Sequence, residues 1–104
     1  MANIQYLGLK SLEEPETEQL KNIIETYTPK FERQVPNFKL KVSVKKSRIL
    51  GKMARFNINF RLESKQRRFH SEQNGWGLIK TTRRCGEHMQ TLLEKQMSRE
   101  RERK

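Results

Sequence analysis

Apolar and polar residues alternate strictly in two stretches of the chain, residues 38–44 and 56–62. Successive side chains of a strand point to opposite faces, so each stretch predicts a strand with one apolar face and one polar, largely basic face. The connection between the two strands is expected at residues 46–52, with Gly51 in the turn. The centre of the chain therefore predicts two neighbouring strands that are buried on one face only.

Two weaker patterns predict further strands. Residues 4–9 are short and mainly apolar, which favours a first strand. Residues 66–72 alternate less clearly and indicate an edge strand. The dipeptide Asn74-Gly75 is a turn signal, so the chain is expected to reverse there.

The apolar spacing changes to three and four in a segment that predicts an amphipathic helix over residues 15–34. Pro15 suits the first helical position, and acidic residues stand in the first turn. Pro29 is expected to kink this helix or to end it, because its ring excludes the hydrogen bond back to Glu25. The expected buried face comprises Leu20, Ile23, Ile24, Tyr27 and Phe31.

A second helical pattern begins at Trp76, which is expected to anchor the core rather than to stack on a base. Its apolar stripe comprises Leu78, Ile79, Thr82, Cys85, Met89, Leu92 and Leu93. On one flank of that stripe lie Lys80, Arg84, His88 and Lys95. We expect one domain over residues 1–97, followed by a charged C-terminal tail over residues 98–104.

The order of these elements predicts an α+β domain. It is a two-layer sandwich of order β-α-β-β-β-α, with two helices packed on one face of a mostly antiparallel four-stranded sheet. An antiparallel sheet tolerates one solvated face, so the other face of the sheet is expected to be open and basic.

Charge strengthens this picture. The 104 residues carry a net charge of +11. Residues 1–37 have a net charge of −2, residues 38–86 of +12, and residues 87–104 of +1. An excess needed for solubility alone would be spread more evenly, so the central block predicts a polyanionic partner.

Catalysis, metals and cofactors are not expected. All twelve acids are Glu, and Cys85 with His88 is a weak nucleophile–base pair because Cys85 lies on the apolar stripe. His70, His88 and Cys85 lack paired metal-ligand spacing. The chain is therefore not expected to be an enzyme, to bind a cofactor or to take a small-molecule substrate.

The layout resembles the ribosome hibernation-promoting factor family, also called ribosome-associated inhibitor proteins, in its short, single-domain form. The likeness covers nearly the whole chain: a first strand Ile-Gln-Tyr-Leu-Gly-Leu, an acid-started helix Glu-Pro-Glu-Thr-Glu-Gln-Leu, two alternating strands, a polar-basic third and a final amphipathic helix entered through Trp76. The chain departs from the family at Cys85 and Gly86, where a Lys and a Leu are usual, and at Lys80, where an acid is common.

This resemblance implies an RNA-binding, ribosome-associated protein that regulates translation under stress. Members bind the small ribosomal subunit in the channel of messenger and transfer RNA, contacting ribosomal RNA through basic residues of the sheet and last helix. The sequence shows neither the linker nor the second domain of the long family form, so we do not expect ribosomes to pair through such a domain. The candidate RNA-binding residues here are Lys39, Lys41, Lys45, Arg55, Arg61, Arg68, Lys80, Arg83, Arg84, His88 and Lys95.

Three alternatives stay open. A double-stranded RNA-binding domain has a similar core, but this chain has Gly77-Leu78-Ile79-Lys80 where that domain carries a Lys-Lys-x-Ala-Lys run. The cations could serve solubility alone, or attract an anionic membrane surface. No segment resembles a transmembrane helix or signal peptide, so we expect a cytoplasmic protein that binds no membrane and is monomeric away from the ribosome.

Overall fold

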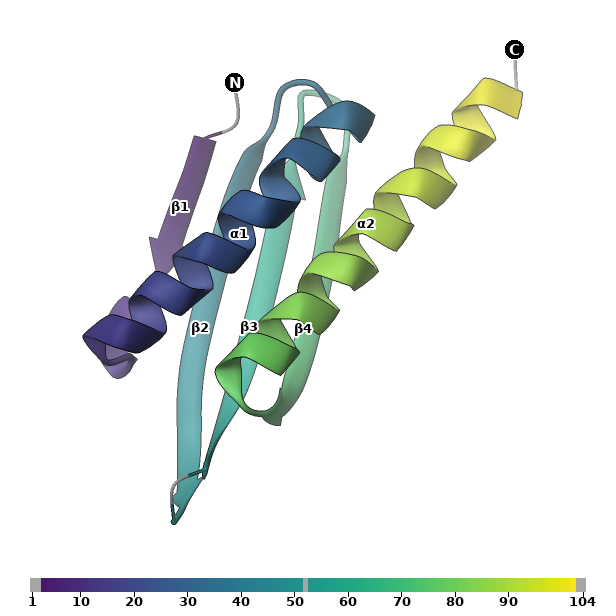
Figure 1. Cartoon of the computed structure of the whole chain (residues 1–104). Coiled ribbons are helices and arrows are strands. Elements are labelled where there is room, and N and C mark those ends of the chain that lie inside the picture. The colour runs from purple at the N-terminus through teal and green to yellow at the C-terminus, as the bar shows by residue number, and fades with distance from the viewer. Residues whose placement is uncertain (1–2, 52, 103–104) are drawn as a thin grey trace.

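The computed structural model describes residues 3–51 and 53–102. In this part of the chain, one four-stranded sheet carries two long helices on a single face (Figure 1). The strands lie in the order β1-β2-β3-β4, with β1 parallel to β2 and the other pairs antiparallel. This confirms the predicted α+β fold. The elements are β1 (Asn3–Leu7), a 3₁₀ turn η1 (Leu9–Ser11), α1 (Glu14–Gln34), β2 (Lys39–Leu50), β3 (Met53–Glu63), β4 (Arg68–Trp76) and α2 (Leu78–Glu102).

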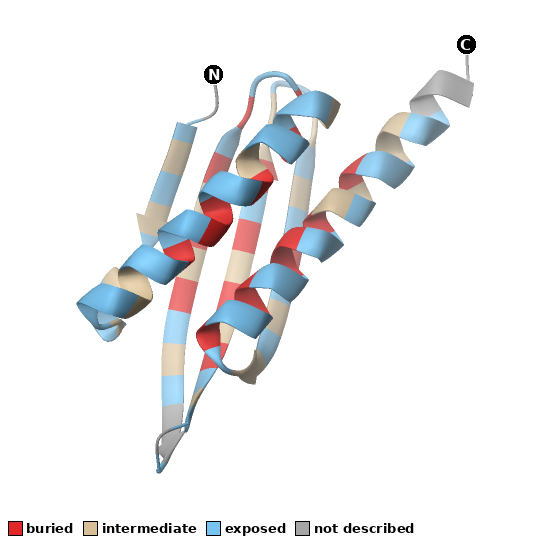
Figure 2. Cartoon of the chain, in the orientation of Figure 1, coloured by how far each residue is buried: buried red, intermediate tan, exposed pale blue. Residues whose placement is uncertain are grey.

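The alternation in β2 and β3 places their apolar residues beneath the helices (Figure 2). The predicted connection at residues 46–52 was too long, because Lys46 to Leu50 belong to β2 and pair with β3 across a register shift after Ser47. Gly51 does serve the turn, with a φ of 59° that favours glycine. Lys52 lies outside the described residues. The extra strand length carries the β2–β3 hairpin past the ends of both helices (Figure 1).

Helix α1 is defined at its start by a capping box. The Glu13 side chain accepts from the backbone N–H three residues on, and Glu16 accepts from the Glu13 backbone N–H at 2.9 Å. The helix continues through Pro29 to Gln34, so the expectation that it could end at Pro29 was wrong. Pro29 and Glu25 are both exposed, so water can satisfy the Glu25 carbonyl that the proline leaves without its helical donor.

The connection from β4 to α2 also differs from prediction. Asn74 and Gly75 belong to β4 rather than to a turn, and the chain reverses at Gly77, which has a φ of 89°. Gly75 is required by packing, because a Cβ at this position would lie 2.9 Å from Thr81 Oγ1 of α2. Trp76 ends β4 and is partly exposed, so the expected role as a core anchor was wrong.

Helix α2 covers β3 and β4 and packs beside α1. Most of its predicted stripe is buried, but Ile79 is 39% exposed. The helix continues beyond Met97 to Glu102, so residues 98–102 of the expected tail are helical. Arg103 and Lys104 lie outside the described residues.

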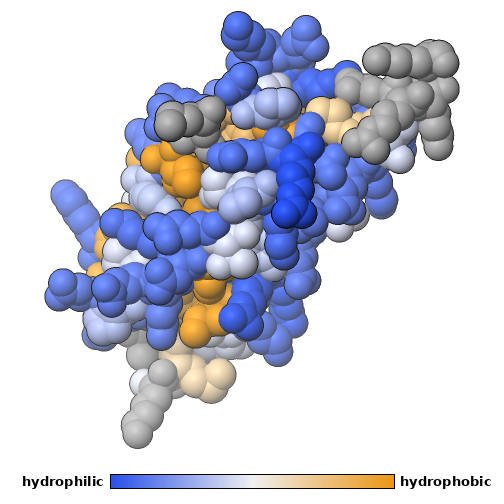
Figure 3. Space-filling view, turned by 45° about the horizontal axis from the view of Figure 1, so that its top comes forward, coloured by the Kyte–Doolittle hydropathy of each residue, from blue (hydrophilic) through white to orange (hydrophobic). Residues whose placement is uncertain are grey.

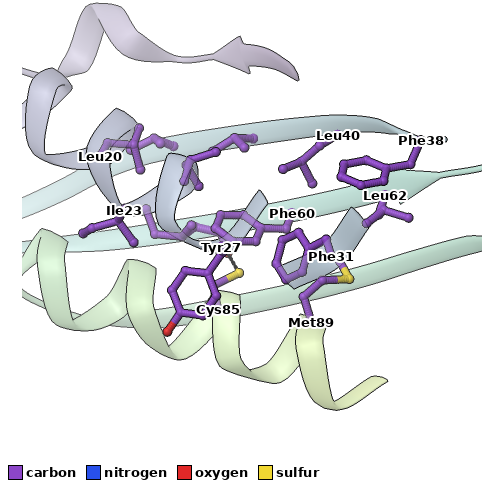
Figure 4. Packing of buried hydrophobic residues seen from close by; sticks show 14 of the residues in the cluster. Leu20, Ile23, Tyr27, Phe31, Phe38, Leu40, Phe60, Leu62, Cys85 and Met89 are labelled. Atoms are coloured by element: carbon purple, nitrogen blue, oxygen red, sulfur yellow. Dashed lines mark hydrogen bonds between the residues drawn. The ribbon is translucent and has the colours of Figure 1, made fainter. Parts of the chain in front are cut away.

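The core lies between the sheet and the two helices (Figure 4). The predicted α1 face, Leu20, Ile23, Ile24, Tyr27 and Phe31, is buried as expected. Helices α1 and α2 are in close contact where Gly86 faces the Tyr27 ring, since a Cβ at Gly86 would lie 2.8 Å from that ring. Gly86 therefore has a packing reason to stand inside a helix, where glycine is otherwise unfavourable.

Candidate nucleic-acid interface

The sheet face opposite the helices is open. Residues with odd numbers between 39 and 47 in β2 and between 55 and 63 in β3, and with even numbers in β4, point to this face because their neighbours lie under the helices. The predicted sheet residues therefore share one outer face. They are Lys39, Lys41, Lys45, Arg55, Arg61 and Arg68.

Two cations and a histidine form one row across this face. Lys41 of β2 is directly opposite Arg61 of β3, which is directly opposite His70 of β4. Directly paired residues have Cβ atoms about 4.5–5.5 Å apart, and like charges in such pairs are destabilising. The row therefore does not serve fold stability, and its positive potential is available to an anionic partner.

The neighbouring row carries an acid between its two cations. Lys39 and Arg68 stand on either side of Glu63, which pairs with both of them across the strands. At the hairpin end, Arg55 pairs with Ser47 and Trp76, and Lys45 pairs with Asn57. The predicted basic face thus comprises a row with Lys41 and Arg61, a row in which Glu63 lies between Lys39 and Arg68, and two separate cations.

A hydrogen-bonded amide network separates these cations. Asn59 Oδ1 contacts His70 Nε2 at 2.9 Å, and the Asn59 amide donates to Asn57 Oδ1 at 2.6 Å. The Asn57 amide donates to Asn74 Oδ1 and Glu72 Oε2 at 2.8 and 2.9 Å. Sequence reasoning missed these asparagines, although their alternate spacing on a polar strand face was a usable signal. The network holds His70 at the end of the cationic row.

The predicted flank of α2 lies along the free edge of β4. Arg84, His88 and Lys95 are all exposed there. A Cβ at Gly75 of β4 would lie 3.9 Å from the Arg84 guanidinium, so that side chain extends over the strand. His88 Nδ1 contacts the buried Ser71 hydroxyl of β4 at 2.7 Å, which fixes the imidazole beside the edge.

The outer sheet face and the α2 flank meet at β4. The cationic row ends at His70, and the next residue, Ser71, contacts His88. One positive surface therefore bends around the free edge of β4, where edge-strand backbone groups are also exposed. We call this the β4-edge surface, comprising Lys41, Arg61, His70, Arg84, His88 and Lys95.

One other predicted residue of α2 lies apart from this surface. Arg83 is on the opposite flank of α2, where it faces α1 beside Tyr27 and Glu87. Lys80, in the first turn of α2, lies one turn before Arg84 on the same flank and extends that flank to the start of the helix. Arg83 is thus separated from the cations with which it was grouped.

Cys85 is held inside the core. Its thiol donates to the Ser71 carbonyl at 3.3 Å, and burial raises its pKa to about 11. The predicted role as a small buried residue is confirmed, and the thiol makes no contact with His88 as a nucleophile–base pair would require. Among the described residues, no three His, Cys, Asp or Glu side chains are grouped to hold a metal ion.

Neither helix, over the residues the structure describes, combines the length and apolar character needed to cross a bilayer.

Comparison with protein-family models and with curated protein sequences found no match. Comparison with solved structures found a ribosomal subunit interface protein from Coxiella burnetii. It is 14% identical, with a TM-score of 0.58, and the alignment covers 94% of this chain and 99% of that chain. At this identity the likeness is one of fold, and it extends over nearly the full length of both chains.

Proposed function

We propose that this protein binds ribosomal RNA of the small ribosomal subunit and inhibits translation by occupying the channel used by messenger and transfer RNA. The observation that carries the proposal is the β4-edge surface, where Lys41 and Arg61 stand opposite each other and cations continue onto α2. The name of the solved structure with the same fold, a ribosomal subunit interface protein, supports a ribosomal partner.

The geometry suits RNA recognition by shape and phosphate. The amide and imidazole groups of the outer face stand between the cations, so base edges or ribose hydroxyls could bond there while the cations contact phosphates. The mechanism needs no chemistry. A small domain that sits in the channel excludes messenger and transfer RNA by occupancy, as a cytoplasmic monomer acting in ribosome hibernation under stress.

Co-sedimentation with purified small subunits over a range of salt concentrations tests this function. Wild-type binding should weaken steeply with salt, because each phosphate contact releases counterions. The variant K41E/R84E should lose binding at moderate salt. The matched control K21E/R33E makes the same change of charge on exposed residues of α1 and should bind like the wild type.

Two outcomes would contradict the proposal. Equal losses in K41E/R84E and K21E/R33E would mean that net charge alone attracts the protein to RNA. Stronger binding to free duplex RNA than to the small subunit in a gel-shift assay would favour the double-stranded RNA-binding alternative. An in vitro translation assay should show inhibition by the wild type and by K21E/R33E only.

A further inference from the structure

An open groove lies at the end of the molecule where the β2–β3 hairpin extends past the helices. It has a volume of about 940 Å³, within the range of sites that hold small ligands. Its apolar floor includes Met53 and Ala54 of β3 and Leu78 and Ile79 of α2. Met53 is 58% exposed and Ile79 39% exposed, so both present apolar surface to solvent. Figure 3 shows apolar surface at this end, bordered by hydrophilic side chains.

Charged residues from both helices line the rim of this groove. The acids of the α1 side are already engaged: Glu16 pairs with Lys46 at 3.1 Å, and Glu13 closes the capping box. The bond from the Glu13 backbone and the Lys46 ammonium lower the pKa of Glu16 against the opposing effect of its partial burial, so it stays ionised and paired.

The α2 side of the rim carries three cations, Lys80, Arg83 and Arg84, and one acid, Glu87. Lys80 and Arg84 make no ion pair with any carboxylate whose side chain the structure describes. The first turn of α2 also contains no acid, which leaves the positive end of its dipole uncompensated. An occupant that complements this groove has an apolar, flat part for the floor and a negative charge for Lys80 and Arg84.

We propose that this groove holds an unpaired nucleotide of the bound RNA, with its base on the floor beside Met53 and Ile79 and its phosphate at Lys80 and Arg84. The proposal rests on the proposed function, because Arg84 belongs to both the groove and the β4-edge surface. It adds a preference for single-stranded or bulged RNA, since a base inside a duplex cannot reach the floor.

A nucleotide fits better than an acidic peptide for one reason. Arg84 reaches from the groove to β4 at Gly75, so an RNA strand following the β4-edge surface leads directly to the groove. Successive phosphates would then contact cations along α2 while one base turns into the groove. A peptide would need a separate path and would compete with the RNA at Arg84.

Trp76 provides a direct test, because it is the only tryptophan of the chain and lines the groove. A single-stranded RNA oligonucleotide of mixed sequence should change Trp76 fluorescence, and the same strand annealed to its complement should not. Fluorescence anisotropy of end-labelled RNA measures both affinities independently. The single strand should bind about tenfold more tightly than the duplex, because one base contact changes an affinity by about that factor.

The variant M53Q/I79Q should abolish most of this preference without changing duplex affinity, since it alters the floor and no charge. The matched control L7Q changes another exposed large apolar residue, 45% exposed on β1, and should retain the preference. If M53Q/I79Q folds poorly by circular dichroism, K80Q alters only an exposed rim residue and should weaken single-strand binding several-fold.

Three results would overturn this inference: no preference for the single strand, equal loss of both RNA forms in M53Q/I79Q, or binding without a change in Trp76 fluorescence. Binding of an acidic, leucine-containing peptide to the groove, detected by Trp76 fluorescence, with no effect on RNA affinity would also overturn it, in favour of a protein partner. Co-sedimentation separates the two proposals, because binding of small subunits that K41E/R84E loses and K21E/R33E retains supports the proposed function whether or not the groove prefers a single strand.

Discussion

Replacement of Gly86 by alanine sets two effects of opposite sign against each other. Alanine is favoured over glycine inside a helix by about 1 kcal/mol. The added Cβ, however, would lie 2.8 Å from the Tyr27 ring, and overpacking of this kind costs about 1–3 kcal/mol. The sign of the net effect depends on whether Tyr27 can move away.

The surroundings of Tyr27 leave it little room. The residue is 7% exposed, and its ring stacks on the fully buried Phe31 with 6.0 Å between centroids. The Tyr27 hydroxyl donates to the Arg83 carbonyl at 3.4 Å, and Lys30 lies 5.1 Å from the ring centroid on the solvent side. We therefore expect the overlap to prevail and Gly86→Ala to destabilise the protein by up to about 2 kcal/mol.

Urea unfolding followed by circular dichroism measures this change, and thermal unfolding should show a melting point about 4–8 °C lower for each kcal/mol. Ser98→Ala, at an exposed position of α2, should be slightly stabilising and controls for helix propensity. In a Tyr27→Leu background the ring is absent, so Gly86→Ala should become neutral or stabilising. A more stable Gly86→Ala protein in the wild-type background would refute the reasoning.

Three further predictions concern single residues. Gly8→Ala should destabilise the fold by about 2 kcal/mol or more in urea unfolding, because Gly8 has a φ of 83° and an added Cβ would overlap the Val44 carbonyl. Gly77 has a φ of 89° but open space around it, so Gly77→Ala should lose less stability. Cys85 should react with iodoacetamide far more slowly in the native protein at pH 8 than in urea, since burial raises its pKa to about 11, and rapid native labelling would contradict that burial. Glu16→Gln should lose up to about 1 kcal/mol at neutral pH by calorimetry. Folding lowers the pKa of Glu16, so the stability that its carboxylate contributes is fully present above the unfolded pKa of about 4.3. That contribution should vanish as the pH falls through the lower pKa of the folded protein. If the stability difference between the wild type and Glu16→Gln stays constant down to pH 2, the ion pair is not its source.

The two-layer fold was predictable because periodicity determines which side chains are buried. Period two identified the inward residues of β2 and β3, and a spacing of three and four identified those of α1. The errors came from local signals that tertiary contacts override. Asn74-Gly75 is a turn signal, but Gly75 is needed inside β4 to let Thr81 approach. The polar residues after Val44 resemble a loop, yet cross-strand pairing with β3 extends β2 through them.

The candidate site was predictable only in part. Alternation placed Lys41 and Arg61 on the outer face, but their direct opposition depends on the register between two strands, which the pattern does not determine. The separation of Arg83 from Arg84 follows from where α1 packs against α2. The contact between Ser71 and His88 joins distant residues across the β4 edge, and the hairpin groove exists only because the strands are longer than expected. These features depend on long-range packing.

The attachment of β1 has a consequence for the order in which the molecule opens. Strands β2, β3 and β4 follow one another in sequence as neighbours, whereas the five residues of β1 join the sheet only through parallel pairing with β2 after the whole of α1 has intervened. No residue of β1 is fully buried. Native-state hydrogen exchange should therefore find β1 in the least protected cooperative unit. The amides of β1 should exchange through a partial opening that leaves β2, β3, β4 and α2 folded.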